Sequence, residues 1–508
     1  MRPWLPIVGL LAAAALAAAC TSRLSAASRP AAADTPPAAE TWPIEARVSY
    51  LVNLFHWVDN LAGTSIGKTR AVYQRQWEKT FGPPSPADAA QLEAYRQVRT
   101  RPEPVVRPDR LPDAQSCLPT SFPRLSARQR FNTAVLRSDT LPQLERALAP
   151  VVGPADAATV RRVLAHFEPR FRRLWPRMAF LGPFHERFER WLRARPVQDL
   201  MLRFAHFLEV QADPSRPTVV HLVGLLEQGS THAEASGRFL LVEIRPADGP
   251  ADQTQVIFHE LAHDLLRRQP ARVRDAFARR LMARGAVGAL AQTLLHEGLP
   301  TALGQGVARA TLTPNHFAFR DRWYHVDAID RFAHRIYTAV RQEIHSPRSY
   351  SSRLPDLVGD AVAGSPTTGS TPIAFFVSHA AFLARGNRLD VLRPLMRSAA
   401  GRAQFGVATD HPDGRTFLAR HPCQPLIWLL TAEEMTTARL PDGDLIPAAH
   451  FAVPPSARSA GWIVPATRKS GAAVLLLIGR DASALPLLVE RTARLRGWPQ
   501  RTIAVSPR

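Results

Sequence analysis

The stretch VIFHELAHDLL, Val256 to Leu266, decides the fold class of this 508-residue chain. Asp252, with Gln255 three residues on, offers an amino-terminal cap for a helix that carries the stretch. On a helix His259 and His263 are four residues apart and project side by side, so both imidazoles can bind one zinc ion. A chance His-Glu-x-x-His is expected only about a few hundredths of a time in a chain of this composition. The stretch therefore predicts a zinc site.

Two histidines are too few ligands for zinc, so the rest of the chain must supply a third. LAQTLLHEGLPTALGQG, residues 290–306, provides Glu297 after 33 intervening residues, on a second predicted helix that ends near Gly298 and Pro300. His296, its neighbour, is the alternative third ligand. Three protein ligands with an open fourth position are typical of a catalytic zinc site.

The pair HELAH and HEGLP resembles the pattern of gluzincin-type zinc metallopeptidases over roughly residues 215 to 340, and the flanking helices loosely resemble uncharacterised bacterial lipoprotein metallopeptidases. The resemblance implies that His259, His263 and Glu297 hold Zn²⁺ and that Glu260 is the general base for a zinc-activated water. It also implies an oxyanion donor from Tyr324 or His325, and a sheet beside the helix whose edge strand binds extended peptide.

The sequence departs from this group in its second coordination sphere. Many members place an Asp four residues after the third ligand to orient a histidine, and this chain has Thr301 there. We expect Asp264 or a backbone carbonyl to orient the histidine instead. The chain also lacks a Gly-x-Met-Glu-Asn stretch, so the sequence does not indicate an exopeptidase.

Around the motif, the patterns predict an α+β fold that is predominantly helical. Residues 217–228 and 237–246 read as two strands, the segments 371–386 and 425–435 as buried helices, and the end of the chain as a small sheet with one helix. The predicted organisation comprises a signal peptide over 1–19, a flexible tether over 20–44, a helical region over 45–212 that begins with a helix over 45–63, a zincin-like catalytic domain over 213–438 with a small mixed sheet, and an α/β accessory subdomain over 439–508.

The amino terminus predicts export and lipid anchoring. MRPWLPIVGLLAAAALAAAC has an early Arg, a short apolar run and small residues leading to Cys20, and it resembles a bacterial lipobox. We expect a lipoprotein of the cell envelope, facing the periplasm or the exterior, although an ordinary cleaved secretory signal is the alternative. Cys117 and Cys423 remain, either as a disulfide or as two separate buried thiols.

Charge and function classes complete the predictions. The net charge is +21, but Arg is spread along the whole chain and Lys occurs only at Lys68, Lys79 and Lys469, so we expect no nucleic-acid partner. The expected partners are a peptide or protein substrate and the membrane that holds the lipid anchor. Two alternatives to a peptidase stay open: a zinc amide hydrolase for cell-wall peptides, and a silent scaffold lipoprotein with a retained metal site. The sequence does not indicate an oligomeric state.

Overall fold

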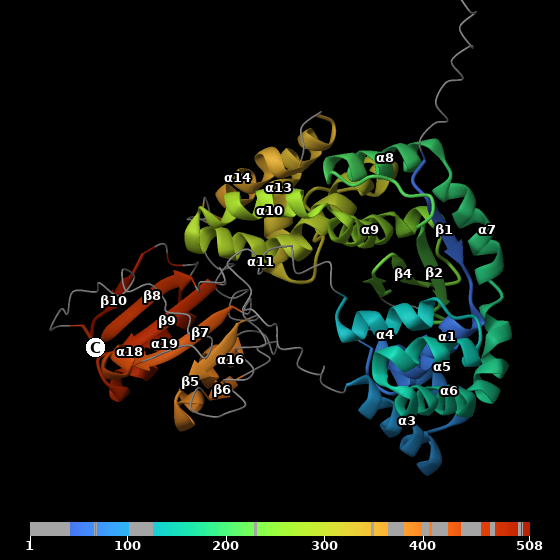
Figure 1. The fold of residues 1–508 in the computed structure, drawn as a ribbon, viewed down its shortest axis with the longest axis horizontal. Coiled ribbons are helices and arrows are strands. Elements are labelled where there is room, and N and C mark those ends of the chain that lie inside the picture. The colour runs from blue at the N-terminus through green and yellow to red at the C-terminus, as the bar shows by residue number, and fades with distance from the viewer. Residues whose placement is uncertain are drawn as a thin grey trace, which may run out of the picture. The chain divides into compact units, whose positions relative to one another are not determined.

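The computed structural model of the chain is mostly helical and contains two β-sheets, which confirms the predicted α+β class (Figure 1). One compact unit runs from Trp42 to Arg508. The structure describes residues 41–65, 67, 69–100, 125–227, 231–346, 350–363, 380–398, 406–408, 425–437, 459–467, 473–495, 499 and 501–507. Cys20, Cys117 and Cys423 lie outside these ranges, so the lipidation and the disulfide stay predictions.

The first sheet has four strands in the order β1-β2-β4-β3. The two predicted strands are confirmed as β2 (Thr218–Gly224) and β4 (Phe239–Ile244), and they pair in parallel. The stretch predicted as their connection contains a further strand, β3 (Ala233–Ser236), which pairs antiparallel with β4 at the edge of the sheet. Gly237, with φ +63°, forms the tight turn between them because glycine adopts positive φ at little cost.

The first strand corrects the predicted start of the helical region. The helix predicted from residue 45 is β1 (Ile44–Arg47) followed by α1 (Tyr50–Leu61), and β1 pairs in parallel with β2. Ser49 separates the two elements, since its side chain accepts a hydrogen bond from the Val52 N–H at 3.3 Å and so caps α1. A strand of four residues is too short to show a clear alternation of apolar and polar residues, so the sequence pattern of α1 was extended over it.

Helices of the amino-terminal half cover one face of this sheet. Val52 of α1 and Leu136 of α4 pack against Val219, Val223 and neighbouring side chains of the sheet. After β1 the described elements of the predicted helical region are helices, as the sequence predicts. The elements are α2 (Arg70–Phe81), α3 (Pro86–Arg99), α4 (Ala127–Leu136), α5 (Leu141–Val152), α6 (Pro154–Leu174), η2 (Trp175–Met178), α7 (Leu181–Leu192) and α8 (Arg195–Phe207).

The helix of the His-Glu-x-x-His stretch is α9 (Thr254–Arg268), which contacts β3 and β4. The predicted cap is wrong in position: Asp252 accepts from the Gly249 N–H at 2.7 Å and so caps the preceding 3₁₀ turn η3 (Pro250–Gln253), while Gln253 precedes α9. Pro250 at the start of η3 explains the extra turn, because proline fixes φ and favours the first helical position.

The helix of the third ligand continues beyond its predicted end. Helix α11 (Gly285–Thr301) passes Gly298 and Pro300 and runs into a π-helical segment, η4 (Ala302–Ala308), and then into α12 (Arg309–Leu312). Pro300 lacks an N–H and removes one helical hydrogen bond without ending the helix. The other elements of this region are α10 (Ala271–Met282), η5 (Pro314–His316), α13 (Asp327–Ile344) and α14 (Tyr350–Ala363).

The second sheet has six strands in the order β10-β8-β9-β7-β5-β6. The sheet and single helix predicted at the end of the chain are confirmed, but the helix predicted over 371–386 is wrong in its described part, which forms β5, and the helix predicted over 425–435 is wrong as far as Thr431, where β7 ends, while residues 432–435 belong to the helix α18. The sheet therefore draws strands from both sides of residue 438, where the sequence placed a domain boundary. Its elements are β5 (Ala381–Ala384), η6 (Gly386–Leu392), α16 (Arg393–Ser398), β6 (Gly406–Ala408), β7 (Leu426–Thr431), α18 (Ala432–Thr437), β8 (Gly461–Thr467), β9 (Ala473–Gly479), η8 (Ala482–Ala484), α19 (Leu485–Ala493) and β10 (Ile503–Val505).

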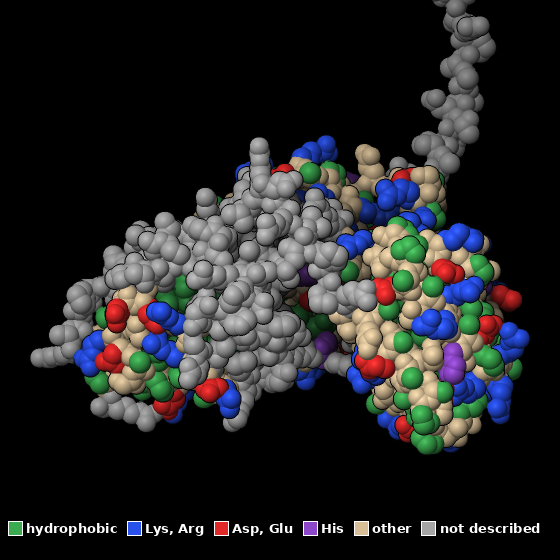
Figure 2. All heavy atoms as spheres, turned by 60° about the horizontal axis from the view of Figure 1, so that its bottom comes forward, with side chains coloured by type: hydrophobic (Ala, Val, Ile, Leu, Met, Phe, Trp, Pro, Cys, Tyr) green, Lys and Arg blue, Asp and Glu red, His purple; other side chains and the backbone are tan. Residues whose placement is uncertain are grey.

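Basic side chains do not gather into a single patch on the face drawn in Figure 2, where Lys and Arg are interspersed with Asp and Glu. Exposed arginines pair with nearby acids, as in Arg172 with Glu168 at 2.8 Å and Arg494 with Glu490 at 2.6 Å. Interspersed charges of both signs are typical of a solvated surface.

Candidate metal centre

His259, His263 and Glu297 come together from two helices. The Nε2 atoms of the histidines are 3.2 Å apart, and Glu297 Oε2 lies 3.4 Å from His259 Nε2 and 3.5 Å from His263 Nε2. Within the described parts of the chain these three form the one group of His, Cys, Asp or Glu side chains close enough to hold a metal ion, with all ligand atoms within 4.8 Å of one another. The sequence placed them in one site, and the structure brings their donor atoms to one point.

The alternative third ligand, His296, does not join this group. Its side chain is 46% exposed, and its Nδ1 lies 3.6 Å from Glu297 Oε1, the oxygen that faces away from the two ligand histidines. Its ring meets the His263 ring edge-on, with centroids 5.2 Å apart. Glu297 is therefore the better placed third ligand.

The protonation states of His263 and Glu297 suit a metal of the zinc type. Burial lowers the pKa of His263 to about 4, so at neutral pH its imidazole is in the neutral form that binds metals. Burial would raise the pKa of Glu297, but the two histidines outweigh it and hold that pKa well below its ordinary value. Two imidazoles and one carboxylate are a donor set that zinc accepts in catalytic sites.

Glu260 follows the first ligand on α9 and has a different environment from Glu297. Burial raises the pKa of Glu260 to about 7, against the opposing charge of His259. Part of its side chain remains accessible. An accessible carboxylate with a pKa near neutrality is well suited to exchange protons with water.

Tyr324 reaches the centre, whereas His325 stacks on Tyr324 and has an exposed side chain. The Tyr324 hydroxyl donates a hydrogen bond to Glu297 Oε2 at 3.1 Å, and its ring is nearly parallel to that of His259, with centroids 6.1 Å apart. The His325 side chain is exposed, and its ring stacks on the Tyr324 ring at 4.5 Å. Of the two predicted oxyanion donors, Tyr324 is the one whose polar atom the structure places among the ligands.

The partner that orients His259 is Gln305, which was not predicted from the sequence. Gln305 Oε1 accepts a hydrogen bond from His259 Nδ1 at 3.3 Å, which leaves Nε2 to face the other ligands. Gln305 lies in η4, which packs closely on α9: a Cβ on Gly304 would lie 2.5 Å from Gln255 O and 2.7 Å from His259 N. The sequence signal is the Gly-Gln-Gly triplet at 304–306, whose first glycine permits this approach.

The expectation that Asp264 orients a ligand histidine is wrong, and Thr301, at the position where many gluzincins have an Asp, contacts neither histidine through a hydrogen bond. Thr301 is fully buried, and its hydroxyl has no hydrogen-bond partner. Asp264 instead pairs with Arg268 at 2.7 Å and accepts from the Thr218 hydroxyl at 3.2 Å, which joins α9 to β2. Asp264 follows His259 by five residues, a spacing that places the two side chains on different faces of a helix. Asp264 therefore points to the sheet while His259 faces the other ligands.

The edge strand that the resemblance assigns to peptide binding is partly covered. Strand β3 is the edge of the sheet and contacts α9, but Gln129 and Thr133 of α4 donate to the carbonyl oxygens of Ala235 at 3.5 Å and Ser236 at 3.3 Å. Glu234, in the same strand, accepts from Asn132 at 2.8 Å. Part of this edge is thus already shared with α4.

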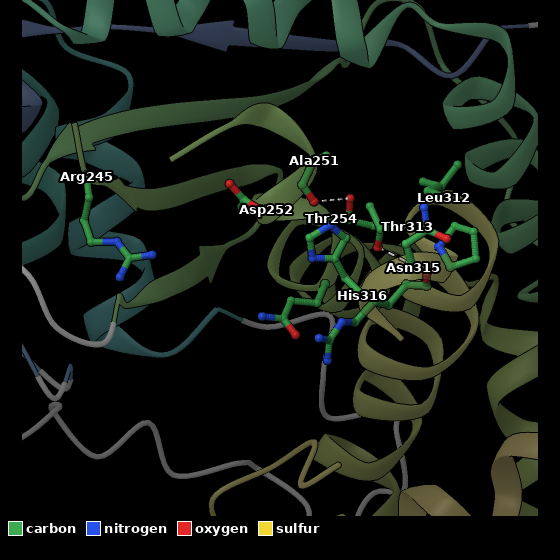
Figure 3. A pocket seen from close by; sticks show the side chains of 11 residues that line it. Arg245, Ala251, Asp252, Thr254, Leu312, Thr313, Asn315 and His316 are labelled. Carbon is green, nitrogen blue, oxygen red and sulfur yellow. Dashed lines mark hydrogen bonds between the residues drawn. The ribbon is translucent and has the colours of Figure 1, made fainter. Parts of the chain in front are cut away.

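A cavity of about 420 Å³ opens at the amino-terminal end of α9. In Figure 3, Arg245 lies on one side of it and Leu312 to His316 on the other, with Ala251, Asp252 and Thr254 between. Its two arginines already have acidic partners, since Arg245 pairs with Asp248 at 2.7 Å and Arg309 lies 3.6 Å from Asp321. Both arginines of the lining are therefore engaged in ion pairs of the protein itself.

Comparisons of the chain with protein-family models, with curated proteins and with solved structures find no significant match. The chemistry of the centre therefore rests on the residues of this chain alone.

Proposed function

We propose that this chain is a zinc-dependent peptidase, anchored by a lipid at Cys20 and acting outside the cytoplasm. The observation that carries the proposal is the convergence of His259, His263 and Glu297, whose ligand atoms lie within 4.8 Å of one another. Glu260 next to them, with a pKa near 7, supplies the base that hydrolysis requires. The zincin-like character of the domain belongs to the same proposal.

Each residue then has a distinct task. Zinc, when bound by the two histidines and Glu297, would polarise the scissile carbonyl and make a water molecule more acidic. Glu260 takes the proton of the attacking water and delivers it to the leaving amine. Tyr324, whose hydroxyl already reaches Glu297 Oε2, donates a hydrogen bond to the developing oxyanion.

The predicted export signal supports an extracytoplasmic location, and the structure adds one finding on membranes. No helix among the described residues is long and apolar enough to cross a bilayer. In this proposal, attachment depends on the lipid that Cys20 would carry.

Hydrolysis of a peptide library by the purified protein tests the proposal, with Glu260→Gln as the matched control. We expect the wild type to cleave peptides and the variant to lose that activity while both bind zinc. Cleavage of muropeptides alone would instead support the cell-wall amide hydrolase. Zinc binding without turnover on any substrate would support the silent scaffold.

A further inference from the structure

One carboxylate fixes the segment that carries Tyr324. Oδ1 of Asp330 accepts hydrogen bonds from the backbone N–H groups of Trp323 at 2.7 Å and Tyr324 at 2.8 Å. Asp330 lies in the first turn of α13, which packs against α11, the helix of Glu297. We propose that Asp330 is a positioning residue that holds Tyr324 against the metal centre, an inference that rests on the proposed function.

The backbone of Tyr324 needs such an anchor. Tyr324 lies outside regular secondary structure, so no helical or strand ladder holds its N–H. The two N–H groups that converge on one oxygen of Asp330 fix the backbone at two successive residues. The anchor therefore transfers the rigidity of α13 to a loop residue.

The neighbouring side chain attaches the segment to the same helix. Trp323 is buried, and its ring stacks on His334 of α13 with centroids 3.9 Å apart. His334 also bonds the Phe319 carbonyl oxygen through Nε2 at 2.8 Å. The packing of Trp323 thus holds the segment against α13. Asp330 fixes the backbone from which the Tyr324 side chain extends toward Glu297.

The position of the phenol is what the anchor controls. The Tyr324 hydroxyl lies 3.1 Å from Glu297 Oε2 and donates one hydrogen bond to this ligand oxygen. A displacement of about 1 Å is enough to cost a catalytic group about 10²-fold in rate. Without Asp330 the Trp323 side chain would stay packed on α13, but the backbone N–H of Tyr324 would no longer be held by the carboxylate.

A variant series with two readouts tests this inference. The variants are Asp330→Ala, Asp330→Asn, Asp330→Glu, Tyr324→Phe and the double variant Asp330→Ala with Tyr324→Phe. The matched control is Thr338→Ala, because Thr338 is an exposed residue of the same helix, α13. The readouts are the visible spectrum of the cobalt-substituted protein, which reports on Glu297, and kcat and KM for a peptide that the wild type cleaves.

We expect Asp330→Ala to reproduce Tyr324→Phe in both readouts: the same spectral change and a similar fall in kcat of about 10- to 100-fold, with KM little changed. The double variant should be no worse than Tyr324→Phe, because both changes remove one interaction. Asp330→Asn should behave like the wild type, since its amide oxygen still accepts, and Asp330→Glu should be impaired because its oxygen is displaced.

Several results would overturn the inference. Multiplied losses in the double variant would mean that Asp330 acts independently of Tyr324, and an unaffected Asp330→Ala would remove its role altogether. If Asp330→Ala does not fold, Asp330→Asn and Asp330→Glu test the inference instead. An impaired Asn variant together with an unimpaired Glu variant would contradict it, because the charge of residue 330 would then matter and the position of its oxygen would not. A wild type that binds cobalt but cleaves nothing refutes the proposed function alone, because the spectrum still tests the anchor. A wild type that does not bind cobalt refutes both.

Discussion

Glu260 and Glu297 of the centre have identical side chains, but their environments shift the carboxyl pKa in opposite directions. Glu260 has a pKa raised to about 7, while the pKa of Glu297 is held far below its ordinary value by His263 and His259 against the effect of burial. At the residue scale this difference assigns proton transfer to Glu260 and metal binding to Glu297.

The two glutamine variants should therefore fail in different ways. Glu260→Gln should keep zinc and lose turnover by about 10²–10⁴-fold or more, because the base is removed and the ligands remain. Glu297→Gln should weaken zinc retention as well as activity, because a neutral amide is a poorer zinc ligand than a carboxylate. Metal analysis after dialysis, combined with peptide hydrolysis, separates the two. A fully active Glu260→Gln protein would contradict the assigned mechanism.

The sequence predicts residues of the centre best where they lie on one helix. His259, Glu260 and His263 follow from a single helical period, because their relative placement depends only on local geometry. Glu297 and Tyr324 required a resemblance to known enzymes, since their approach depends on how separate elements pack. Gln305 could not be predicted, because its place depends on a π-helical segment and on a glycine contact between two helices.

At the scale of the element, η4 is the feature that most affects the centre. A π-helical segment adds a residue to the helical turn and is frequent at functional sites. Here it follows the helix of Glu297 and directs Gln305 to His259 Nδ1. The helix that carries Glu297 thus continues into the segment whose Gln305 contacts His259.

Gln305→Ala should weaken zinc binding by about 10- to 100-fold, because His259 loses the partner that fixes its ring orientation and tautomer. Competition with a chromophoric chelator measures the affinity without any substrate. Thr301→Val is the matched control on the same helix, since the Thr301 hydroxyl makes no hydrogen bond, and it should bind zinc like the wild type. Equal affinities for Gln305→Ala and the wild type would exclude the orienting role.

Strand prediction failed where strands are short or wholly apolar. Strand β7, Leu426–Thr431, is buried at every position, so its apolar run shows no alternation and resembles a buried helix. Strand β9, also buried throughout, was predicted correctly because Gly479 and Asp481 mark its end. Whether this segment forms a strand or a buried helix depends on its pairing with β5 and β9, which the sequence alone does not reveal.

Helices α1, α3 and α4 are joined by a buried ion pair network around Asp59. Arg99 Nε lies 2.9 Å from Asp59 Oδ1, Arg128 lies 3.5 Å from Oδ2, and the Tyr95 hydroxyl donates to Oδ1 at 2.9 Å. Burial opposes ionisation, but the two arginines outweigh it and lower the pKa of Asp59 to about 2.

Because the folded pKa of Asp59 is depressed, its stabilisation is present above the unfolded pKa of 3.8 and is lost as pH falls toward about 2. This linkage amounts to about 2 kcal/mol. Asp59→Asn should be less stable than the wild type at pH 5, and the difference should shrink by about that amount as pH falls from about 4 to about 2. Urea unfolding across this range measures it, and a difference that stays constant with pH would contradict the lowered pKa.

At the scale of the whole molecule, the proposed function requires attachment to a membrane through Cys20. Cys20→Ser removes the acceptor of the lipid, so the protein should leave the membrane fraction or accumulate with its signal segment uncleaved. Fractionation of cells that express each form, with immunoblotting for the mature size, measures both outcomes. Normal maturation together with unchanged membrane association would refute the lipoprotein prediction.

The remaining whole-molecule question is whether the folded chain carries a metal at all. Zinc content per purified chain, measured by mass spectrometry for the wild type and for His263→Ala, tests this most directly, with circular dichroism to show that both are folded. The account predicts about one zinc per wild-type chain, as three protein ligands with an open fourth position require. It predicts almost none in His263→Ala, because the variant loses one of the three ligand atoms that converge in the structure. Equal zinc in both proteins, or none in the wild type supplied with zinc, would contradict it.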